Sequence, residues 1–568
     1  MNRRRAILTI GGMGFLAMPG GVSPSGPFIG FPPNGDGLQC ANAGSIQVTG
    51  TNSPLLAGEV LEVEFKIECT IDRQVSSTVD LAIDGVRVDS TDVIISQDAA
   101  VVGTLSWQTE EGSGTTEGEA YEVTVSTGIE RDTVTIYITS QTDERAGSVF
   151  HFAVNAVEDL GLDPSGNDPI EDELESLEPK TLVQFPAGEY LIAETTSVEG
   201  GYLGLEGQGE VRFVVPEGYS DNVLEGREIK VMYISDIDVD QTASHSAAGF
   251  DLHGDRIHIQ HMEFIGRADV WNTASNDMLD ISIETSTGYG EIRNVVHKEG
   301  HWARYGPSSS GRIGVYTGRR HKGTLKIVDC DLREFGNNAL YCSKTQPEGR
   351  VEVEDSYFEN NNVSSIRIGG EGSYAENCTI VIDPSTYSGP RTYELDNFSL
   401  RGIVIEERFE SGDIQKPAGA EIRNCDIRIE DNPANGAAIH RWGNGRSMRV
   451  VGTTIEYNND GYDTAILVTS GGMGKNPEAD PPKQFEFIGS ELHGTGEVDA
   501  AIIIDGADDS IITDSLIHMH DGGQDGVWIH NSIGCIIEDS TIDVPGNPTE
   551  FVQAEVTVEN IELEHQDI

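Results

Sequence analysis

The tetrapeptide Gly314-Val315-Tyr316-Thr317 recurs in altered form seven more times before residue 531. Every copy has a small residue, an apolar residue, a variable residue and, in most copies, another apolar residue. The variable positions are residues 316, 341, 367, 404, 440, 467, 503 and 528, so successive copies lie 25, 26, 37, 36, 27, 36 and 25 residues apart. Alternation with a period of two is typical of a β-strand. A repeat of about 25 residues, at times longer by about ten, predicts a solenoid whose units stack on one another.

A second strand phrase follows most copies of the first and ends in a turn. Its last position is a small residue that directly follows Asn or Asp, as at Cys330, Cys378, Cys425, Ser515 and Ser540. A stack of small residues beneath such a turn allows successive coils to lie in register. We therefore expect the three cysteines to be buried as thiols.

The segment before the repeats carries a further pattern. Residues 170–177 form an acidic helix candidate, with Asp168 placed as its cap and Pro169 at its first position. The phrase Phe185-Pro186-Ala187-Gly188-Glu189-Tyr190 follows. Together with the repeats, this arrangement resembles the opening of right-handed parallel β-helix domains of the pectin-lyase-like superfamily, over roughly residues 155–550. The resemblance implies an all-β fold in which a short helix covers the first coil, and it implies little about the chemistry.

Four parts are expected along the chain. Residues 1–36 form a signal peptide and linker, and residues 37–152 form a small sandwich. Residues 153–550 form the right-handed parallel β-helix with its N-terminal capping helix, and residues 551–568 form a C-terminal cap. Strand phrases that begin at Ser45, Val60, Thr78, Glu122 and Thr133, with Asp84-Gly85 as a hairpin signal, predict that the sandwich is immunoglobulin-like. A spacer or a carbohydrate-binding module is the expected role of this part.

The amino terminus predicts export. Arg3, Arg4 and Arg5 precede a short, moderately apolar run that ends near Met18, a pattern that resembles a twin-arginine leader. No later stretch approaches the ~18 apolar residues of a membrane helix, so no span is expected after leader removal. The expected location is extracellular or at the cell surface. A disulfide between Cys40 and Cys69 is compatible with that location.

The charge of the chain excludes one class of partner. The 568 residues include 37 Lys plus Arg and 95 Asp plus Glu, for a formal net charge of −58. Nucleic acid requires a basic surface, so general affinity for nucleic acid is excluded. The acidity resembles that of proteins from halophilic archaea, because molar salt screens charges within about 3 Å. Calcium storage or cationic partners are the alternative explanation.

The repeats predict an exposed column of side chains. The variable residue of each copy points outward if its neighbours point inward. Aromatic rings, Arg, His and carboxylates in such columns suit a groove for a sugar chain, although Tyr, Trp and Arg also fit any exposed strand. The candidate substrate-binding residues are Tyr316, Tyr341, Trp442, Trp528 and Arg401.

Extra residues in the longer repeats, at 381–400, 407–419 and 470–483, are expected to form walls around the middle of this column. The candidate catalytic residues lie there. Glu406 would act as acid, base or nucleophile, His440 as its proton-transfer partner, and Arg367 as the cation that neutralises a uronate. The alternative is an Arg–Glu–His surface network without any reaction.

Asp251 and Asp280 form the candidate metal site. The repeat places them on adjacent coils, about 4.8 Å apart. Such a pair either shares a proton or binds a hard cation such as calcium, and chance pairing is common in so acidic a chain.

Two functions are therefore carried forward. The first is a secreted protein that binds and degrades an extracellular polysaccharide, as a lyase or a glycoside hydrolase. The second is a non-catalytic cell-surface or adhesive rod that binds glycans or envelope components.

Overall fold

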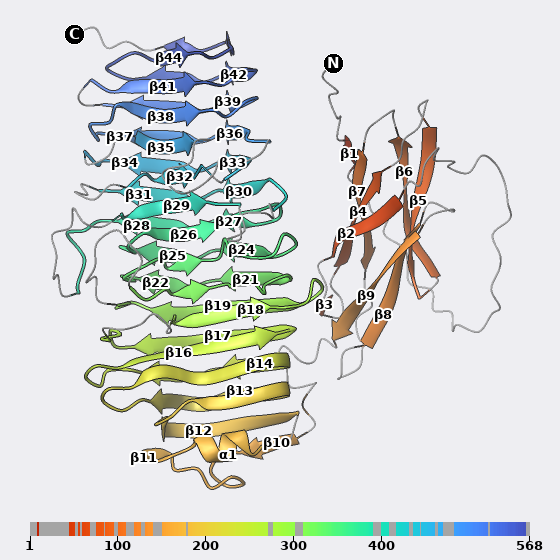
Figure 1. Cartoon of the computed structure of the whole chain (residues 1–568), viewed down its shortest axis with the longest axis vertical. Helices are drawn as coiled ribbons and strands as arrows, with labels where there is room; N and C mark the ends of the chain where they lie inside the picture. The colour runs from red at the N-terminus through yellow and green to blue at the C-terminus, as the bar shows by residue number, and fades with distance from the viewer. Residues whose placement is uncertain are drawn as a thin grey trace, which may run out of the picture. The chain divides into compact units, whose positions relative to one another are not determined.

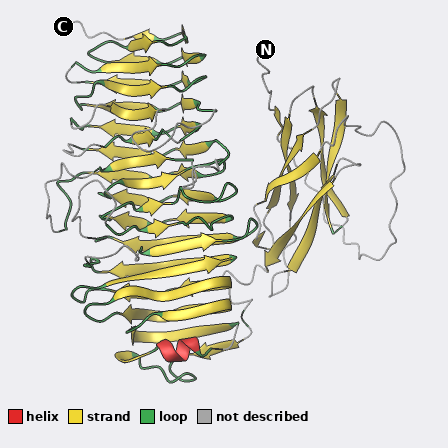
Figure 2. Cartoon of the chain, viewed as in Figure 1, coloured by secondary structure: helices red, strands yellow, loops and turns green. Residues whose placement is uncertain are grey.

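The computed structural model describes residues 8–10, 45–51, 55–56, 60–68, 75–84, 86–95, 100–108, 119–126, 131–139, 150, 152–177, 180–270, 277–301, 311–389, 399–407, 416–430, 436–443, 445–460, 464–469, 482–520 and 523–563. The chain divides into two compact units, Met1–Val149 and Phe150–Ile568. Strands make up nearly all of the secondary structure, and α1 (Glu171–Glu175) is the single helix among these residues (Figure 2). None of the described residues form a helix with the length and apolar character that crossing a bilayer requires. Cys40 and Cys69 lie outside the described residues.

The first unit is a β-sandwich. One sheet has the order β1-β7-β4-β2 and the other β3-β9-β8-β5-β6. Their apolar faces share one core, which includes Leu61 and Val63 from the first sheet and Val79 and Leu81 from the second. The predicted strands and the hairpin at Asp84 are present. The strands are β1 (Leu8–Ile10), β2 (Ser45–Thr51), β3 (Leu55–Leu56), β4 (Val60–Glu68), β5 (Val75–Ile83), β6 (Val86–Ile95), β7 (Ala100–Gln108), β8 (Glu119–Ser126) and β9 (Arg131–Thr139).

The second unit is a parallel β-helix, which confirms the fold predicted from the repeats. Its strands form one continuous 37-stranded sheet in which coil stacks on coil (Figure 1). The first two strands, β10 (Phe152–Asn155) and β11 (Ser165–Pro169), are short and pair with different parts of the next strand. Five longer strands of the first coils each extend across two faces: β12 (Thr181–Leu191), β13 (Thr196–Val214), β14 (Ser220–Ser235), β17 (Arg256–Ile265) and β19 (Tyr289–His297).

Later coils have three short strands each, which form three faces. Face A contains β16 (Ala247–Gly254), β18 (Leu279–Ile283), β20 (Val315–Tyr316), β23 (Leu340–Tyr341), β26 (Ser364–Ile368), β29 (Arg401–Ile405), β32 (Ile439–Arg441), β35 (Thr464–Thr469), β38 (Ala500–Asp505), β41 (Asp525–His530) and β44 (Thr549–Val552). Face B contains β21 (Thr324–Val328), β24 (Arg350–Glu354), β27 (Tyr374–Glu376), β30 (Ala420–Arg423), β33 (Met448–Val451), β36 (Phe485–Ile488), β39 (Ile511–Thr513), β42 (Cys535–Glu538) and β45 (Val556–Glu559). Face C contains β15 (Asp238–Asp240), β22 (Asp331–Arg333), β25 (Tyr357–Glu359), β28 (Thr379–Ile382), β31 (Asp426–Ile429), β34 (Thr454–Tyr457), β37 (Glu491–Gly494), β40 (Leu516–Met519), β43 (Thr541–Asp543) and β46 (Glu562–Leu563).

The eight repeated phrases are the strands of face A, in the predicted register. Each variable residue pairs with the next along the column, from Tyr316 opposite Tyr341 to Ile503 opposite Trp528. The apolar residues before them, such as Val315 and Ile366, lie in the core and are fully buried. The register is therefore the same in the longer and the shorter repeats. Most of the extra residues, for which walls were predicted at 381–400, 407–419 and 470–483, lie outside the described residues.

One left-handed turn in each coil lies between faces B and C. The Asn or Asp at this turn has positive φ, as at Asp329 (54°), Asn377 (53°) and Asp514 (52°). Asn and Asp tolerate this conformation better than other residues with a β-carbon, because their side chains bond to nearby backbone groups. This conformation explains the Asn or Asp that precedes most of these small residues, and Gly452 and Gly489 adopt it (59° and 53°) before Thr453 and Ser490.

The small residues after these turns form a hydrogen-bonded ladder. The hydroxyl of Ser490 accepts a bond from the backbone N–H of Thr453 at 3.1 Å, that of Ser515 from Ser490 at 3.2 Å, and that of Ser540 from Ser515 at 3.1 Å. Each hydroxyl also donates to the carbonyl two residues earlier, as Ser515 does to Thr513 at 2.8 Å. Because these backbone N–H groups are buried, the ladder supplies partners that the strands cannot. The thiols of Cys330, Cys378 and Cys425 occupy the same stack and are buried, as predicted.

The first coil is covered by α1, but the predicted cap of this helix is wrong. Residues 165–169 pair with β12 as strand β11, so Asp168 and Pro169 belong to the sheet. Ile170 is the N-cap residue, and no side chain caps the helix. Instead, the carboxylate of Glu171 accepts hydrogen bonds from the backbone N–H groups of Ala193 and, at 2.7 Å, Glu194.

The solenoid also extends further than the predicted boundary at residue 550. β44, β45 and β46 pair in parallel with β41, β42 and β43, so the coils continue to Leu563. Residues 551–563 are therefore part of a coil. The separate cap predicted there is wrong for this segment.

The hydroxyl ladder generates a stability prediction. Ser515→Ala removes the partner of the buried Ser490 N–H, so we expect a loss of about 1–3 kcal/mol in the free energy of unfolding. Ser515→Thr keeps the hydroxyl, and Thr453 shows that the stack accepts this residue; it serves as the control. Urea denaturation followed by circular dichroism measures both. Equal midpoints for Ser515→Ala and the wild type would contradict the role assigned to the ladder.

Candidate functional site

A continuous column of chemically active side chains runs along face A. Asp251 lies opposite Asp280, which lies opposite Tyr316, followed by Tyr341 and Arg367 on the next two coils. Neighbouring coils are about 4.8 Å apart. Residues 25 to 36 positions apart in the sequence thus become neighbours, as the repeat predicted.

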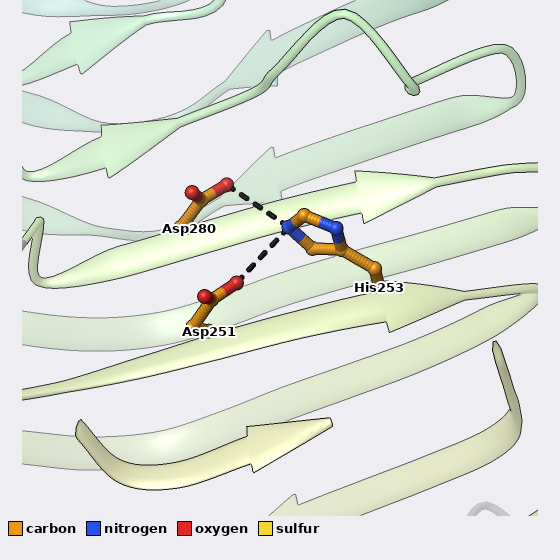
Figure 3. Close-up of side chains that lie close together, drawn as sticks. All are labelled: Asp251, His253 and Asp280. Carbon is orange, nitrogen blue, oxygen red and sulfur yellow. Dashed lines mark hydrogen bonds and ion pairs between the residues drawn. The ribbon is translucent and has the colours of Figure 1, made fainter. Parts of the chain in front are cut away.

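His253 joins the two aspartates at one end of this column (Figure 3). Its Nε2 lies 3.0 Å from Asp251 Oδ1 and 3.3 Å from Asp280 Oδ1. Arg227 holds Asp251 from the preceding coil through two parallel bonds, of 2.9 and 2.5 Å. The side chains of His253, Asp251 and Asp280 are 11%, 18% and 28% exposed, so Asp280 is the most accessible of the three.

The charges in this group compensate one another. Burial alone would lower the pKa of His253, but its bonds to Asp251 and Asp280 raise that pKa to about 9. Burial would raise the pKa of Asp251, but its bonds to His253 and Arg227 hold that pKa below its usual range. At neutral pH an imidazolium therefore lies between two carboxylates. Nearby, burial and the charge of Asp280 raise the pKa of Asp277 to about 7.

This arrangement fits calcium poorly. One nitrogen and two carboxylate oxygens lie within 4.8 Å of one another in Asp251, His253 and Asp280. Calcium takes six to eight oxygen ligands and no imidazole. Moreover, His253 and Arg227 already neutralise the two carboxylates. In place of a proton shared by the two carboxylates or a calcium ion, the geometry places a protonated His253 between Asp251 and Asp280.

Arg367 and Glu406 form an ion pair further along the column. Glu406 Oε2 accepts bonds from Arg367 Nε at 2.9 Å, from Arg367 Nη2 at 2.6 Å and from the Ser343 hydroxyl at 2.7 Å. The guanidinium carbon of Arg367 lies 4.2 Å from the ring centre of Tyr341 and 4.0 Å from that of Trp442. The pair is therefore enclosed: its side chains are 7% and 9% exposed. A carboxylate that accepts three bonds here is held as an anion and orients the arginine between two rings.

His440 does not act with Glu406 as predicted. Val404 and His440 pair in direct register, as expected, but both are buried rather than outward-exposed. Neither ring nitrogen of His440 has a hydrogen-bond partner among the described residues. Burial and the nearby cations Arg401 and Arg367 hold its pKa well below 6.5. The ring is neutral, and no proton-transfer pair with Glu406 is formed. The repeat predicted the position of His440 correctly but not its burial.

The predicted aromatic residues separate into two groups. Tyr316 and Tyr341 pack edge to face with ring centres 5.8 Å apart, and Arg401 lies 6.0 Å from the ring of Trp442. Trp528 is five coils from Arg367 along the column and packs instead on His530, with its Nε1 donating to Asp525 at 2.9 Å. Trp528 is therefore not part of this cluster.

Two important residues were not selected from the sequence. His253 and Ser343 each lie two positions after a column residue, where the period of two places them on the same side of the strand. That spacing was sufficient to find them. Arg227 has no such signal, because it precedes the regular repeats.

No protein-family profile and no curated protein matches the chain. Solved structures with low similarity include ORF18 of Geobacillus virus E2, at 13% identity and a TM-score of 0.32, covering 78% of this chain and 68% of that one. The Agl-KA catalytic domain has 10% identity and a TM-score of 0.35, covering 89% and 91%. The catalytic domain of a GH87 α-1,3-glucanase in complex with tetrasaccharides has 10% identity and a TM-score of 0.34, covering 94% and 99%.

The enclosed ion pair generates a second prediction. Glu406→Gln leaves the buried charge of Arg367 without compensation, so we expect a loss of about 3–5 kcal/mol in the free energy of unfolding. Replacing both residues, as Arg367→Met with Glu406→Met, removes both charges and should restore most of that loss. Urea denaturation of the single and double variants forms the measurement. A double variant less stable than Glu406→Gln would contradict the compensation argument.

A third prediction concerns pH. The pKa of His253 rises from 6.5 to about 9 on folding. The corresponding stabilisation, about 3 kcal/mol, is fully present below pH 6.5 and is lost as the pH rises through 9. The facing groups are Asp251, Asp280, Glu284 and, through Asp251, Arg227. His253→Gln should remove this pH dependence from urea midpoints measured between pH 6 and 10. His245→Gln, at an exposed histidine, should keep it.

Proposed function

We propose that the protein binds an extracellular polysaccharide along face A and hydrolyses its glycosidic bonds at the Asp251–His253–Asp280 group. The observation that carries this proposal is the register of face A, which sets that group beside the rings of Tyr316 and Tyr341 in one column. Rings beside reactive polar groups on a rigid sheet are what recognition of a sugar chain requires. Export by the predicted leader would bring this face into contact with such a polymer.

The proposed binding of the polysaccharide depends on residues in the middle of the face A column. Tyr316 and Tyr341 are half-buried, so part of each ring remains available to stack on a sugar. Arg367 and Glu406 act beneath them as positioning residues, because the guanidinium contacts the rings of both Tyr341 and Trp442. Arg401, whose guanidinium carbon lies 6.0 Å from the ring centre of Trp442, is a further cation placed to meet hydroxyl or uronate groups.

The catalytic half follows from Asp280 and His253. Asp280 Oδ1 lies 3.3 Å from His253 Nε2, so a carboxylate nucleophile and a proton donor are placed side by side on face A. Asp280, the more exposed, attacks the anomeric carbon as the bond to the leaving oxygen breaks. The proton from His253 Nε2 goes to that oxygen. Water then cleaves the ester to Asp280 and returns a proton to His253. Asp251, fixed by Arg227, holds the imidazolium in place.

The second candidate function is a glycan-binding rod without catalysis. The enclosure of the Arg367–Glu406 pair favours it, because a carboxylate saturated by three bonds is a poor acid or base. In that case the column contributes recognition alone.

A direct assay separates the two. The protein is incubated in high salt, with and without calcium, with a panel of neutral and acidic polysaccharides. We expect new reducing ends without the ultraviolet absorbance of unsaturated products, because the mechanism is hydrolysis. Asp280→Asn and His253→Asn should each lower kcat by at least about 100-fold and leave binding intact. Asp505→Asn, the same substitution far along face A, is the control.

Unsaturated products would indicate a lyase and overturn the hydrolytic step. Binding without any product would favour the rod. If Tyr341→Ala leaves the affinity for every polysaccharide unchanged, the column is not the binding site.

A further inference from the structure

We propose that face C carries a binding site for a divalent transition-metal ion, formed by His493, His518, His520 and Asp543. This inference is independent of the polysaccharide function, since the site lies on a different face of the β-helix. It also differs from the calcium expected at Asp251 and Asp280.

The coil register brings these residues together. His493 on β37 lies opposite His518 on β40, which lies opposite Asp543 on β43. The residues beside them, Leu492 and Ile517, are fully buried in the core. The two histidines therefore lie on the outer side of their strands.

The side chains of His518, His520 and Asp543 are already in contact, whereas His493 is placed beside them by the strand register. His518 Nε2 lies 3.0 Å from His520 Nδ1 and 3.3 Å from Asp543 Oδ2. The imidazole rings of His518 and His520 have centres 3.8 Å apart. His520 follows His518 by two residues, so both project from the same side. His518 and Asp543 are 28% and 12% exposed, which leaves access for an ion from solvent.

The donor set identifies the class of ion. Imidazole nitrogens with one carboxylate are ligands of zinc, nickel and copper, whereas calcium and magnesium take oxygen. Two ligands at the ~2.0–2.1 Å of zinc bonds are about 3.3 Å apart around a tetrahedron. The separations of 3.0 Å from His518 Nε2 to His520 and 3.3 Å to Asp543 are close to that value. However, the ligand atoms of no three of the proposed ligand residues all lie within 4.8 Å of one another, so His520 and Asp543 have to approach each other when an ion binds. A modest rotation of the half-exposed rings would direct the donors to a common point.

A charge argument supports the same conclusion. Glu456 lies opposite His493 on the preceding coil, so the column contains carboxylates on both sides of the histidines. A cation placed between them reduces repulsion within a chain of net charge −58.

The test measures metal binding by the full chain. The protein is first freed of bound metal with a chelator and then dialysed into high salt with excess calcium. The excess calcium occupies sites made of carboxylates alone. Zinc binding measured by calorimetric titration therefore reports the sites that contain nitrogen ligands. We expect one saturable zinc site on face C. His518→Ala and His520→Ala should each weaken it by at least tenfold. Two control variants should leave the zinc affinity unchanged. They are His253→Ala and His245→Ala, the latter at an exposed histidine that pairs with Asp269.

A second measurement reports the ligands directly. Cobalt in place of zinc should give the visible absorption of a tetrahedral ion with nitrogen ligands, and that absorption should disappear in His518→Ala. Absence of saturable zinc binding in the wild type, or equal affinity in His518→Ala, would overturn the proposal. In the latter case the ion binds elsewhere, and the histidines are joined only by hydrogen bonds.

Discussion

The register between successive coils is the constraint on which the rest of the molecule depends. Parallel backbone pairing joins each strand to the equivalent strand of the next coil, and one left-handed Asn or Asp turn per coil fixes where the chain changes face. A shift by one residue would exchange the inner and outer side chains of a strand. Core, ladder and outer columns are therefore all consequences of one alignment.

Much of this alignment was predictable from the sequence. The period of two within each phrase identified the inward residues, and the spacing of the phrases identified which outward residues become neighbours. The Asp251–Asp280 and Val404–His440 pairs were found in this way. Such patterns are reliable because the inner side of these strands is packed mainly with apolar side chains, so the inner positions have little freedom.

The chemistry at the outer positions was less predictable. From the period of two alone, every residue that points outward is predicted to be exposed. Arg367 is nevertheless enclosed, because two aromatic rings stack on its guanidinium. Likewise, pairing with β12 took precedence over the helix-capping preference of Asp168. Both outcomes depend on contacts between distant segments, which a local pattern does not contain. The bridging role of His253 depends on its side-chain direction as well as on its position.

The insertions of about ten residues in some repeats have a further consequence. A coil of 36 residues stacks on a coil of 27 with the column intact, as from Val404 through His440 to Leu467. Connecting segments can thus lengthen or shorten during evolution while the reactive groups keep their spacing. The solenoid can acquire a new binding specificity when its connecting segments change, while its strands and their register stay the same.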